Sequence, residues 1–324
     1  MARLLDESAK GVYIISATPF TDSGELDLDS TDRLVDFYLE HGVDGITILG
    51  VMGEAPKLSP AESASFAERV LKRVNGRVQI IVGASSPGNR NLKAFALKMM
   101  DLGAAGVMVS PISGLKNDEQ IENYIGGVVR DLGEQVPIVL QDYPQLTNVF
   151  MSASLLNRMF AQWPSLKVLK HEESPGLRKI SKMRAAEANG ARRRISILVG
   201  NSGIHLPQEL RRGVDGANTG VAYPEMLVEV CKRFFAGDPE GAEDLYDIYL
   251  PIVRHEQQAG IGLAIRKEIF RRRGVIKSAH VRAPGATLDA DDHKELDGLM
   301  ARLERKLKER GLSDAGAARR RAAG

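Results

Sequence analysis

The chain has 324 residues, of which 43% are hydrophobic and 27% are charged, and its formal net charge at pH 7 is +2. This length predicts one large domain of roughly 250 residues with a small appendage. The small net charge argues against a protein that binds nucleic acid or acidic surfaces through its whole body. The single cysteine, Cys231, excludes an intrachain disulfide and fits a reducing cytosol. Because it lies in an apolar run, we interpret it as a core residue.

Residues 1–11 are charged and lack the apolar core of a signal peptide. No apolar stretch approaches the roughly 20 residues that a membrane span needs. We therefore expect a cytoplasmic protein without a membrane partner. Basic residues cluster at Arg192–Arg194, Arg271–Arg273 and Arg319–Arg321. We interpret these clusters as solvent-exposed faces or a frayed end, and we expect no nucleic-acid partner.

Eight short candidate strands, rich in Ile, Val and Leu, alternate with segments of helical length. Such strands are typical of parallel sheets covered on both faces, and eight right-handed βα units can close into a (β/α)₈ barrel. An open doubly wound sheet is the alternative, but the first strand runs into Ala17-Thr18-Pro19-Phe20 and not into a glycine-rich turn. The strands are expected at Val12–Thr18, Gly45–Leu49, Val78–Gly83, Gly106–Ser110, Pro137–Asp142, Lys167–Lys170, Ile195–Val199 and Gly216–Gly220.

Several expected helices begin with residues that cap helices. Ser59-Pro60-Ala61-Glu62 predicts a capping box, and Asn117 and Ser152 are expected to open two further helices. After Pro224 the pattern is helical only. It predicts a catalytic barrel over residues 1–224, the last barrel helix with a helical extension over 225–311, and a disordered basic tail over 312–324. The helices of the extension are expected at Pro239–Arg254, His255–Arg273 and Asp289–Arg310.

The active site of such a barrel lies at the C-terminal ends of its strands, so we consider those ends. In the sixth strand, Val168, Lys170 and Glu172 share one face because strand side chains alternate. Burial in the barrel would lower the pKa of Lys170, and a neutral amine can attack a ketone. Glu172 could move protons around the adduct. The alternative is a structural salt bridge between Lys170 and Glu172.

Three other strand ends offer candidate groups. The turn Gly50-Val51-Met52-Gly53-Glu54 could present its N–H groups to a substrate carboxylate, or it could be a structural turn. Gln141 and Tyr143 share one face of the fifth strand, as a possible substrate contact and a possible catalytic phenol, or they could simply close the barrel top. Gly200-Asn201 could bind hydroxyls or cap a helix. The six histidines lack metal-ligand spacing, so no metal is expected. No cofactor is expected either, because a covalent imine on Lys170 would serve in its place.

Taken together, these motifs resemble the dihydrodipicolinate synthase / N-acetylneuraminate lyase family. The residues that carry the resemblance are Thr18-Pro19-Phe20, the second-strand turn through Leu58-Ser59, the fifth-strand end before Pro144, and Val168-Leu169-Lys170. The resemblance covers about residues 11–311. It implies a (β/α)₈ barrel, usually a homotetramer, that binds pyruvate or another 2-keto acid as an imine on Lys170.

Other positions depart from the family pattern. Val51 and Met52 replace two threonines of the usual proton relay, and Gln141 replaces the catalytic tyrosine. Leu146 stands where dihydrodipicolinate synthases carry an arginine that binds the second substrate. The tyrosine that family members place after the fourth strand, for the active site of a partner subunit, is also missing. Lysine biosynthesis is therefore not expected. Gln-Asp-x-Pro together with Lys170-x-Glu172 resembles the 2-keto-3-deoxy-L-arabonate dehydratase group, whose glutamate is taken to do the acid–base work.

We therefore expect a Schiff-base lyase that dehydrates a 2-keto-3-deoxy sugar acid through an imine on Lys170. A pyruvate-dependent aldolase or hydratase-aldolase is the alternative, because Val51, Met52 and Tyr143 make the pocket more apolar than a sugar acid would favour. A barrel that binds a keto acid without catalysis is the alternative of another class.

Overall fold

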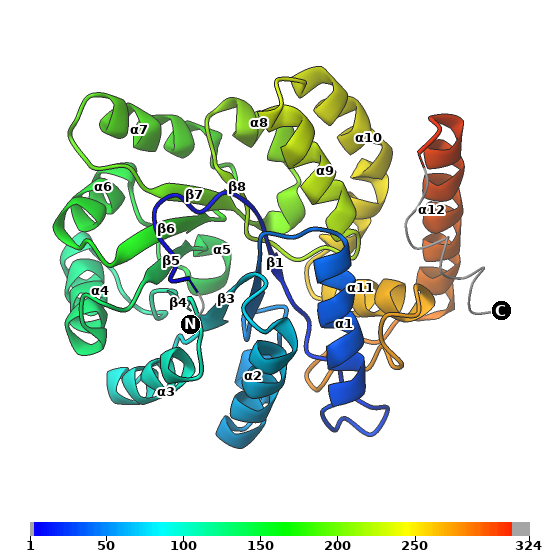
Figure 1. Cartoon of the computed structure of the whole chain (residues 1–324), viewed down its shortest axis with the longest axis horizontal. Coiled ribbons are helices and arrows are strands. Elements are labelled where there is room, and N and C mark those ends of the chain that lie inside the picture. Colours follow the sequence, from blue (N-terminus) through cyan, green and yellow to red (C-terminus); the bar gives the residue numbers. More distant parts are fainter. Residues whose placement is uncertain (1–2, 313–324) are drawn as a thin grey trace.

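The structure is a computed structural model, and it describes residues 3–312. Eight parallel strands close into a barrel in the order β1 to β8, and helices surround them (Figure 1). This confirms the predicted (β/α)₈ fold and excludes the open sheet. The strands are β1 Gly11–Ile15, β2 Gly45–Ile48, β3 Gln79–Gly83, β4 Gly106–Val109, β5 Ile138–Asp142, β6 Leu166–His171, β7 Ser196–Val199 and β8 Gly216–Ala217.

All eight expected strands are present, but β8 is shorter than Gly216–Gly220. After Ala217 the chain leaves the ladder, and the Thr219 hydroxyl accepts a hydrogen bond of 2.7 Å from the backbone N–H of Ser202. The β5–β6 pair positions the site, because it aligns Gln141 with Lys170 and Asp142 with His171. These four residues therefore lie at the same level near the C-terminal end of the barrel.

Capping chemistry sets several helix starts as predicted. Ser59 forms a complete capping box with Glu62, and Asn117 and Ser152 accept hydrogen bonds from the first turns of their helices.

Among residues 3–312, no helix is both long and apolar enough to cross a membrane. The helices are α1 Leu28–Glu40, η1 Ala55–Lys57, α2 Pro60–Val74, α3 Asn89–Asp101, α4 Asp118–Leu132, α5 Pro144–Thr147, α6 Ala153–Gln162, α7 Leu177–Ala188, η2 Asn201–Gly203, α8 Leu206–Arg211, α9 Pro224–Phe235, α10 Pro239–Glu256, α11 Gly262–Arg272 and α12 Ala290–Glu309.

The prediction of one helix over His255–Arg273 is wrong. Helix α10 continues to Glu256, and α11 begins only at Gly262. Two glycines explain the break: Gly260 adopts a left-handed φ of +82°, and a Cβ on Gly262 would overlap with the carbonyl of Glu256. The turn at residues 257–261 separates two helices that lie beside the barrel, whereas α12 is outermost (Figure 1).

The solvent-exposed interpretation of the arginine clusters is wrong for two residues. Arg192 is buried and donates to the carbonyl of Met183, and Arg273 is buried in an ion pair with Glu225. Burial of these guanidinium groups is tolerated because their terminal nitrogens donate to backbone carbonyls, and those of Arg273 donate to the Glu225 carboxylate as well. The cluster Arg319–Arg321 and the rest of the predicted tail from residue 313 lie outside the described residues.

Two hydrophobic cores stabilise the fold. One fills the inside of the barrel, where Tyr13, Met108, Val139 and Val168 pack together, and the other lies largely between strands and helices. Cys231 belongs to the second core, where burial raises the pKa of its thiol to about 12. This confirms Cys231 as a core residue. Because Val168 points into the barrel, strand alternation directs Lys170 inward too.

A buried ion pair joins the helical extension to the barrel. The Lys267 ammonium on α11 is fully buried and lies 2.5 Å from the Glu54 carboxylate in the turn after β2. The same ammonium donates to the carbonyl of His280 and lies over the Phe20 ring. Burial lowers the pKa of Lys267 to about 8, against the attraction of Glu54. The second oxygen of Glu54 accepts from Lys57 and from the N–H of Arg282.

We predict that Glu54→Gln lowers the free energy of unfolding by about 3 kcal/mol at pH 7, since it leaves the buried Lys267 without its counter-charge. The loss should be smaller at pH 9, because Lys267 of the parent protein is then largely deprotonated. Denaturant melts at both pH values measure this. Glu309→Gln, which breaks an exposed pair with Lys306 on α12, is the control and should not change the midpoint. An equal loss at both pH values would contradict this account.

Candidate active site

A cavity of about 540 Å³ opens at the C-terminal ends of the strands. Its walls come from the ends of β1, β2 and β5 to β8, and from the turn between α10 and α11. Seven of the candidate residues line it, whereas Gly50, Gly53, Glu54 and Gly200 are not among the lining residues. The seven are Val51, Met52, Gln141, Tyr143, Lys170, Glu172 and Asn201.

Lys170 and Glu172 meet in this cavity. The Lys170 amine lies 2.9 Å from one carboxylate oxygen of Glu172, and the same oxygen accepts a hydrogen bond of 2.6 Å from the Gln141 amide. Both side chains are almost fully buried, with exposed fractions of 5% for Lys170 and 8% for Glu172. At this distance the carboxylate can take a proton from the ammonium, which would leave an amine able to attack a carbonyl carbon.

The neighbouring residues point to the other side of the strands, as alternation predicts. Asp142 is fully buried and accepts from the Lys179 ammonium at 2.9 Å, and its carboxylate lies 3.3 Å from Nδ1 of His171. Neither Asp142 nor His171 lines the cavity. This second charged cluster is separate from Lys170 and holds the outer face of β5 and β6 together.

Gly200 and Asn201 act on Glu172 from the end of β7. A Cβ on Gly200 would overlap with the Glu172 side chain, so only glycine leaves room for this carboxylate. The Asn201 amide donates to the backbone carbonyl of Glu172 at 2.8 Å. Asn201 and Ser202 both adopt left-handed φ angles, which are strained for residues other than glycine and often occur at functional sites. In this structure Gly200 positions Glu172 and does not itself line the cavity.

The turn after β2 presents two apolar side chains to the cavity. Met52 is buried, whereas Val51 is 52% exposed at the rim. The N–H groups of Gly53 and Glu54 already donate to carbonyls within the turn, and the Thr18 hydroxyl binds the Gly53 carbonyl at 2.7 Å. Glu54 was expected as a substrate contact, but its carboxylate points away and pairs with Lys267. The structural reading of this glutamate is therefore the better one.

Tyr143 is half-buried and lines the cavity. Burial raises the pKa of its phenol, and the negative charge of Glu172 raises it further, whereas Arg266 acts in the opposite direction. The phenol therefore stays protonated near neutral pH and can donate a hydrogen bond.

Comparison with known proteins identifies the family. The model of the dihydrodipicolinate synthetase family matches residues 8–303. The chain belongs to this family. Members of the dihydrodipicolinate synthetase family are lyases, so the protein is an enzyme of that broad class.

Individual relatives of the family carry two different activities. The chain is 30% identical over 299 residues to L-2-keto-3-deoxyarabonate dehydratase from Azospirillum brasilense, covering 91% of this chain and 94% of that protein. It is 30% identical over 248 residues to 4-hydroxy-tetrahydrodipicolinate synthase from Methanocaldococcus jannaschii, covering 76% and 82%. The crystal structure of dihydrodipicolinate synthase from Rhodopseudomonas palustris shares 43% identity and a TM-score of 0.91, covering 93% of this chain and all of that one.

The sequence did not reveal that the helical extension reaches the site. Glu256, Gln257 and Arg266 line the cavity together with Ser202 after β7. Burial raises the pKa of Glu256 to about 7, and its carboxylate lies 3.7 Å from Arg266. The one available signal was Gly260-x-Gly262, which could have indicated a turn inside the expected long helix.

Among residues 3–312, no group of three or more His, Cys, Asp or Glu side chains is placed to hold a metal ion.

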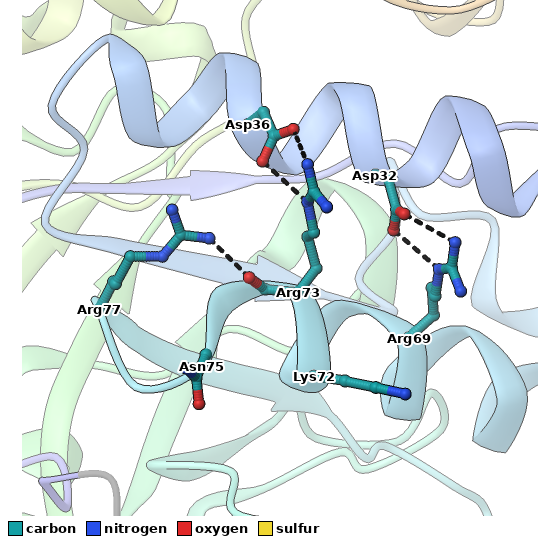
Figure 2. A pocket seen from close by; sticks show the side chains of 7 residues that line it. All are labelled: Asp32, Asp36, Arg69, Lys72, Arg73, Asn75 and Arg77. Atoms are coloured by element: carbon teal, nitrogen blue, oxygen red, sulfur yellow. Dashed lines mark hydrogen bonds and ion pairs between the residues drawn. The ribbon is translucent and has the colours of Figure 1, made fainter.

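A second hollow, of about 650 Å³, lies on the surface between α1 and α2. Figure 2 shows that Arg69 donates two hydrogen bonds to the Asp32 carboxylate and that Arg73 donates two to the Asp36 carboxylate. Both carboxylates are thus already held by arginines. None of the barrel-mouth residues lines this hollow, so it is not the candidate site of the lyase.

We predict that Gly200→Ala displaces the Glu172 side chain. The variant should lose at least about tenfold in lyase turnover and about 1–3 kcal/mol of unfolding free energy, because the new methyl group overpacks the site. Gly298→Ala is the matched control: this exposed position in α12 has no neighbour within 4 Å of an added Cβ, so stability should rise slightly. Full activity in Gly200→Ala would show that the position of Glu172 does not matter.

Proposed function

We propose that this member of the dihydrodipicolinate synthetase family is a Schiff-base lyase that dehydrates a 2-keto-3-deoxy sugar acid. The observation that carries the proposal is the Glu172 carboxylate, which contacts both Lys170 and Gln141 inside the cavity. A single acid–base group therefore lies beside the reactive amine, at the strand end where Gln141 replaces the tyrosine expected from the family.

In the first stage the substrate becomes an imine on Lys170. Glu172 takes a proton from the ammonium, and the neutral amine attacks the C2 carbonyl carbon. Glu172 returns its proton to the hydroxyl of the carbinolamine, which leaves as water, so that a protonated imine and an ionised Glu172 remain. This positive centre withdraws electrons from the C2–C3 region and makes the C3 protons acidic.

In the second stage Glu172 removes one C3 proton, and the electron pair of that C–H bond forms an enamine. The enamine expels the C4 hydroxyl, which leaves as water with the proton that Glu172 returns. If C5 carries a hydroxyl, C5 loses a proton and C3 gains one, which moves the double bond from C3=C4 to C4=C5. The resulting enol gains a proton at C4 and loses its hydroxyl proton to become an aldehyde. Water then hydrolyses the imine and releases a 2,5-dioxo acid from Lys170. The imine supplies the electron sink, so this chemistry needs no cofactor or metal.

Two features support dehydration over lysine biosynthesis. The relative with 91% coverage of this chain is a dehydratase, although synthase relatives also match. Leu146 occupies the position of the arginine that would bind a second carboxylate, and its side chain is exposed. A non-catalytic keto-acid-binding barrel would not require Gly200 to leave space for a carboxylate beside Lys170.

Aldol cleavage is the second candidate, and Tyr143 is the observation that favours it. Cleavage requires a base at the C4 hydroxyl, and Tyr143 is the phenol in the cavity. The apolar Val51 and Met52 would also suit an aromatic or short-chain substrate of a hydratase-aldolase. However, the carboxylate in contact with the Lys170 amine is Glu172, whereas burial raises the pKa of Tyr143 and its phenol stays protonated. This arrangement favours dehydration.

We further propose a homotetramer with closed symmetry, as is usual for soluble oligomers and for this family. We also propose a cytoplasmic location, because the single buried Cys231 fits a reducing compartment.

The products separate the two reactions. We predict that a 2-keto-3-deoxy pentonate is converted to a 2,5-dioxo acid semialdehyde without release of pyruvate, as followed by mass spectrometry of the mixture. Formation of pyruvate and an aldehyde in equal amounts would establish cleavage and refute dehydration. Aromatic 2-keto acids in the same panel test the hydratase-aldolase alternative.

Glu172→Gln should lower turnover at least about 100-fold, because general acid–base catalysis contributes that much. It should still form a borohydride-reducible adduct with pyruvate, since the Lys170 amine that forms the imine is unchanged in this variant. Glu173→Gln is the matched control: Glu173 pairs with Lys179 and does not line the cavity. Unchanged turnover in Glu172→Gln would remove Glu172 from the mechanism.

A further inference from the structure

One wall of the cavity belongs to the helical extension, and Arg266 is its charged group. From α11 its guanidinium reaches the Ser202 hydroxyl after β7 at 2.5 Å and the Gln257 side-chain oxygen at 3.1 Å. The Ser202 hydroxyl also contacts the Gln257 oxygen at 2.5 Å. Three polar side chains from two parts of the chain therefore meet at one place in the cavity wall.

Glu256 completes this cluster. It is 1% exposed, it lines the cavity, and one of its oxygens accepts from the N–H of Ala222 at 3.1 Å. Its other oxygen, Oε1, lies 3.7 Å from Nε of Arg266. Neither atom has a hydrogen-bond partner within residues 3–312. Because buried polar atoms are nearly always hydrogen-bonded, this pair indicates capacity for a further polar group in the cluster.

The charges of the cavity limit what that group can be. Lys170 lies beside the carboxyl group of Glu172, Arg266 lies beside that of Glu256, and His205 also lines the cavity. The substrate brings the carboxylate next to its 2-keto group. A second carboxylate bound at Arg266 would lie close to the buried Glu256 carboxyl group and compete with it for the guanidinium, which is costly in a buried site. A hydroxyl fits better, because it can accept from a guanidinium and donate to a carboxylate or amide oxygen.

We propose that Arg266, supported by Ser202, Gln257 and Glu256, determines specificity by binding the hydroxylated end of the substrate. The other end is held as the imine on Lys170. The substrate class is then a 2-keto acid with one carboxylate and a hydroxylated tail, in preference to an aromatic or dicarboxylic one. This inference rests on the proposed imine chemistry, but it does not depend on whether dehydration or cleavage follows.

The test measures which of two keto acids occupies Lys170. The enzyme is mixed with equal amounts of two five-carbon 2-keto acids, one with hydroxyls at C4 and C5 and one without hydroxyls. Borohydride is added after a short interval, and mass spectrometry gives the ratio of the two adducts on Lys170. Because this ratio is internal to each sample, a partly misfolded variant does not distort it.

The wild type should favour the hydroxylated acid. Arg266→Met should lower that preference about tenfold, as expected for the loss of hydrogen bonds to a charged group. Arg266→Gln is a second variant with a smaller change of polarity, and it should shift the ratio in the same direction. Arg254→Met is the matched control, because Arg254 is exposed on α10 and does not line the cavity; its ratio should equal that of the wild type.

An unchanged ratio in Arg266→Met, or a wild type that favours the unhydroxylated acid, would overturn the inference. Release of pyruvate from the hydroxylated acid, with the Arg266 effect intact, would refute dehydration alone. No adduct of either acid on Lys170 would overturn both the proposed function and this inference.

Discussion

The site depends on an ion pair held inside a closed barrel. Burial of Lys170 and Glu172 costs several kcal/mol for each charge, so the pair persists only where geometry and further hydrogen bonds compensate. Strand alternation supplies the geometry, since residues two apart on β6 point to the same side. The Gln141 amide supplies a hydrogen bond, and the bare backbone of Gly200 leaves room for the carboxylate. A proton can move between amine and carboxylate without water in this arrangement.

Helix α11, which belongs to the helical extension, contacts two parts of the barrel mouth. Lys267 pairs with Glu54 in the turn after β2, whereas Arg266 contacts Ser202 after β7. These adjacent residues leave the helix in different directions, and each ends on a polar group of the barrel. The extension is therefore not only a cover over apolar surface. One of its contacts holds the turn that carries Val51 and Met52, and the other forms part of the cavity wall.

The periodic features of the sequence predicted the fold and the centre of the site. Short apolar strands alternating with capped helices led to the barrel, and the spacing of Val168, Lys170 and Glu172 predicted that two charged groups share the inside of β6. The roles of Glu54 and Arg266 could not be predicted in this way. Glu54 follows a glycine-rich turn that looks like an anion site, but its direction depends on Lys267, which is 213 residues away. Arg266 resembles any helix-surface arginine until the break at Gly260 and Gly262 turns α11 toward the barrel.

The central claim is that Lys170 forms a covalent imine with a 2-keto acid. The most direct measurement is borohydride reduction of the full chain with pyruvate, followed by digestion and mass mapping of the modified peptide. The account predicts one reduced pyruvyl adduct per chain, on Lys170, and none in Lys170→Met. Lys167→Met, which alters a lysine on the same strand that pairs with Glu7 and does not line the cavity, should keep the adduct. An unmodified chain, or an adduct on another lysine, would contradict the account.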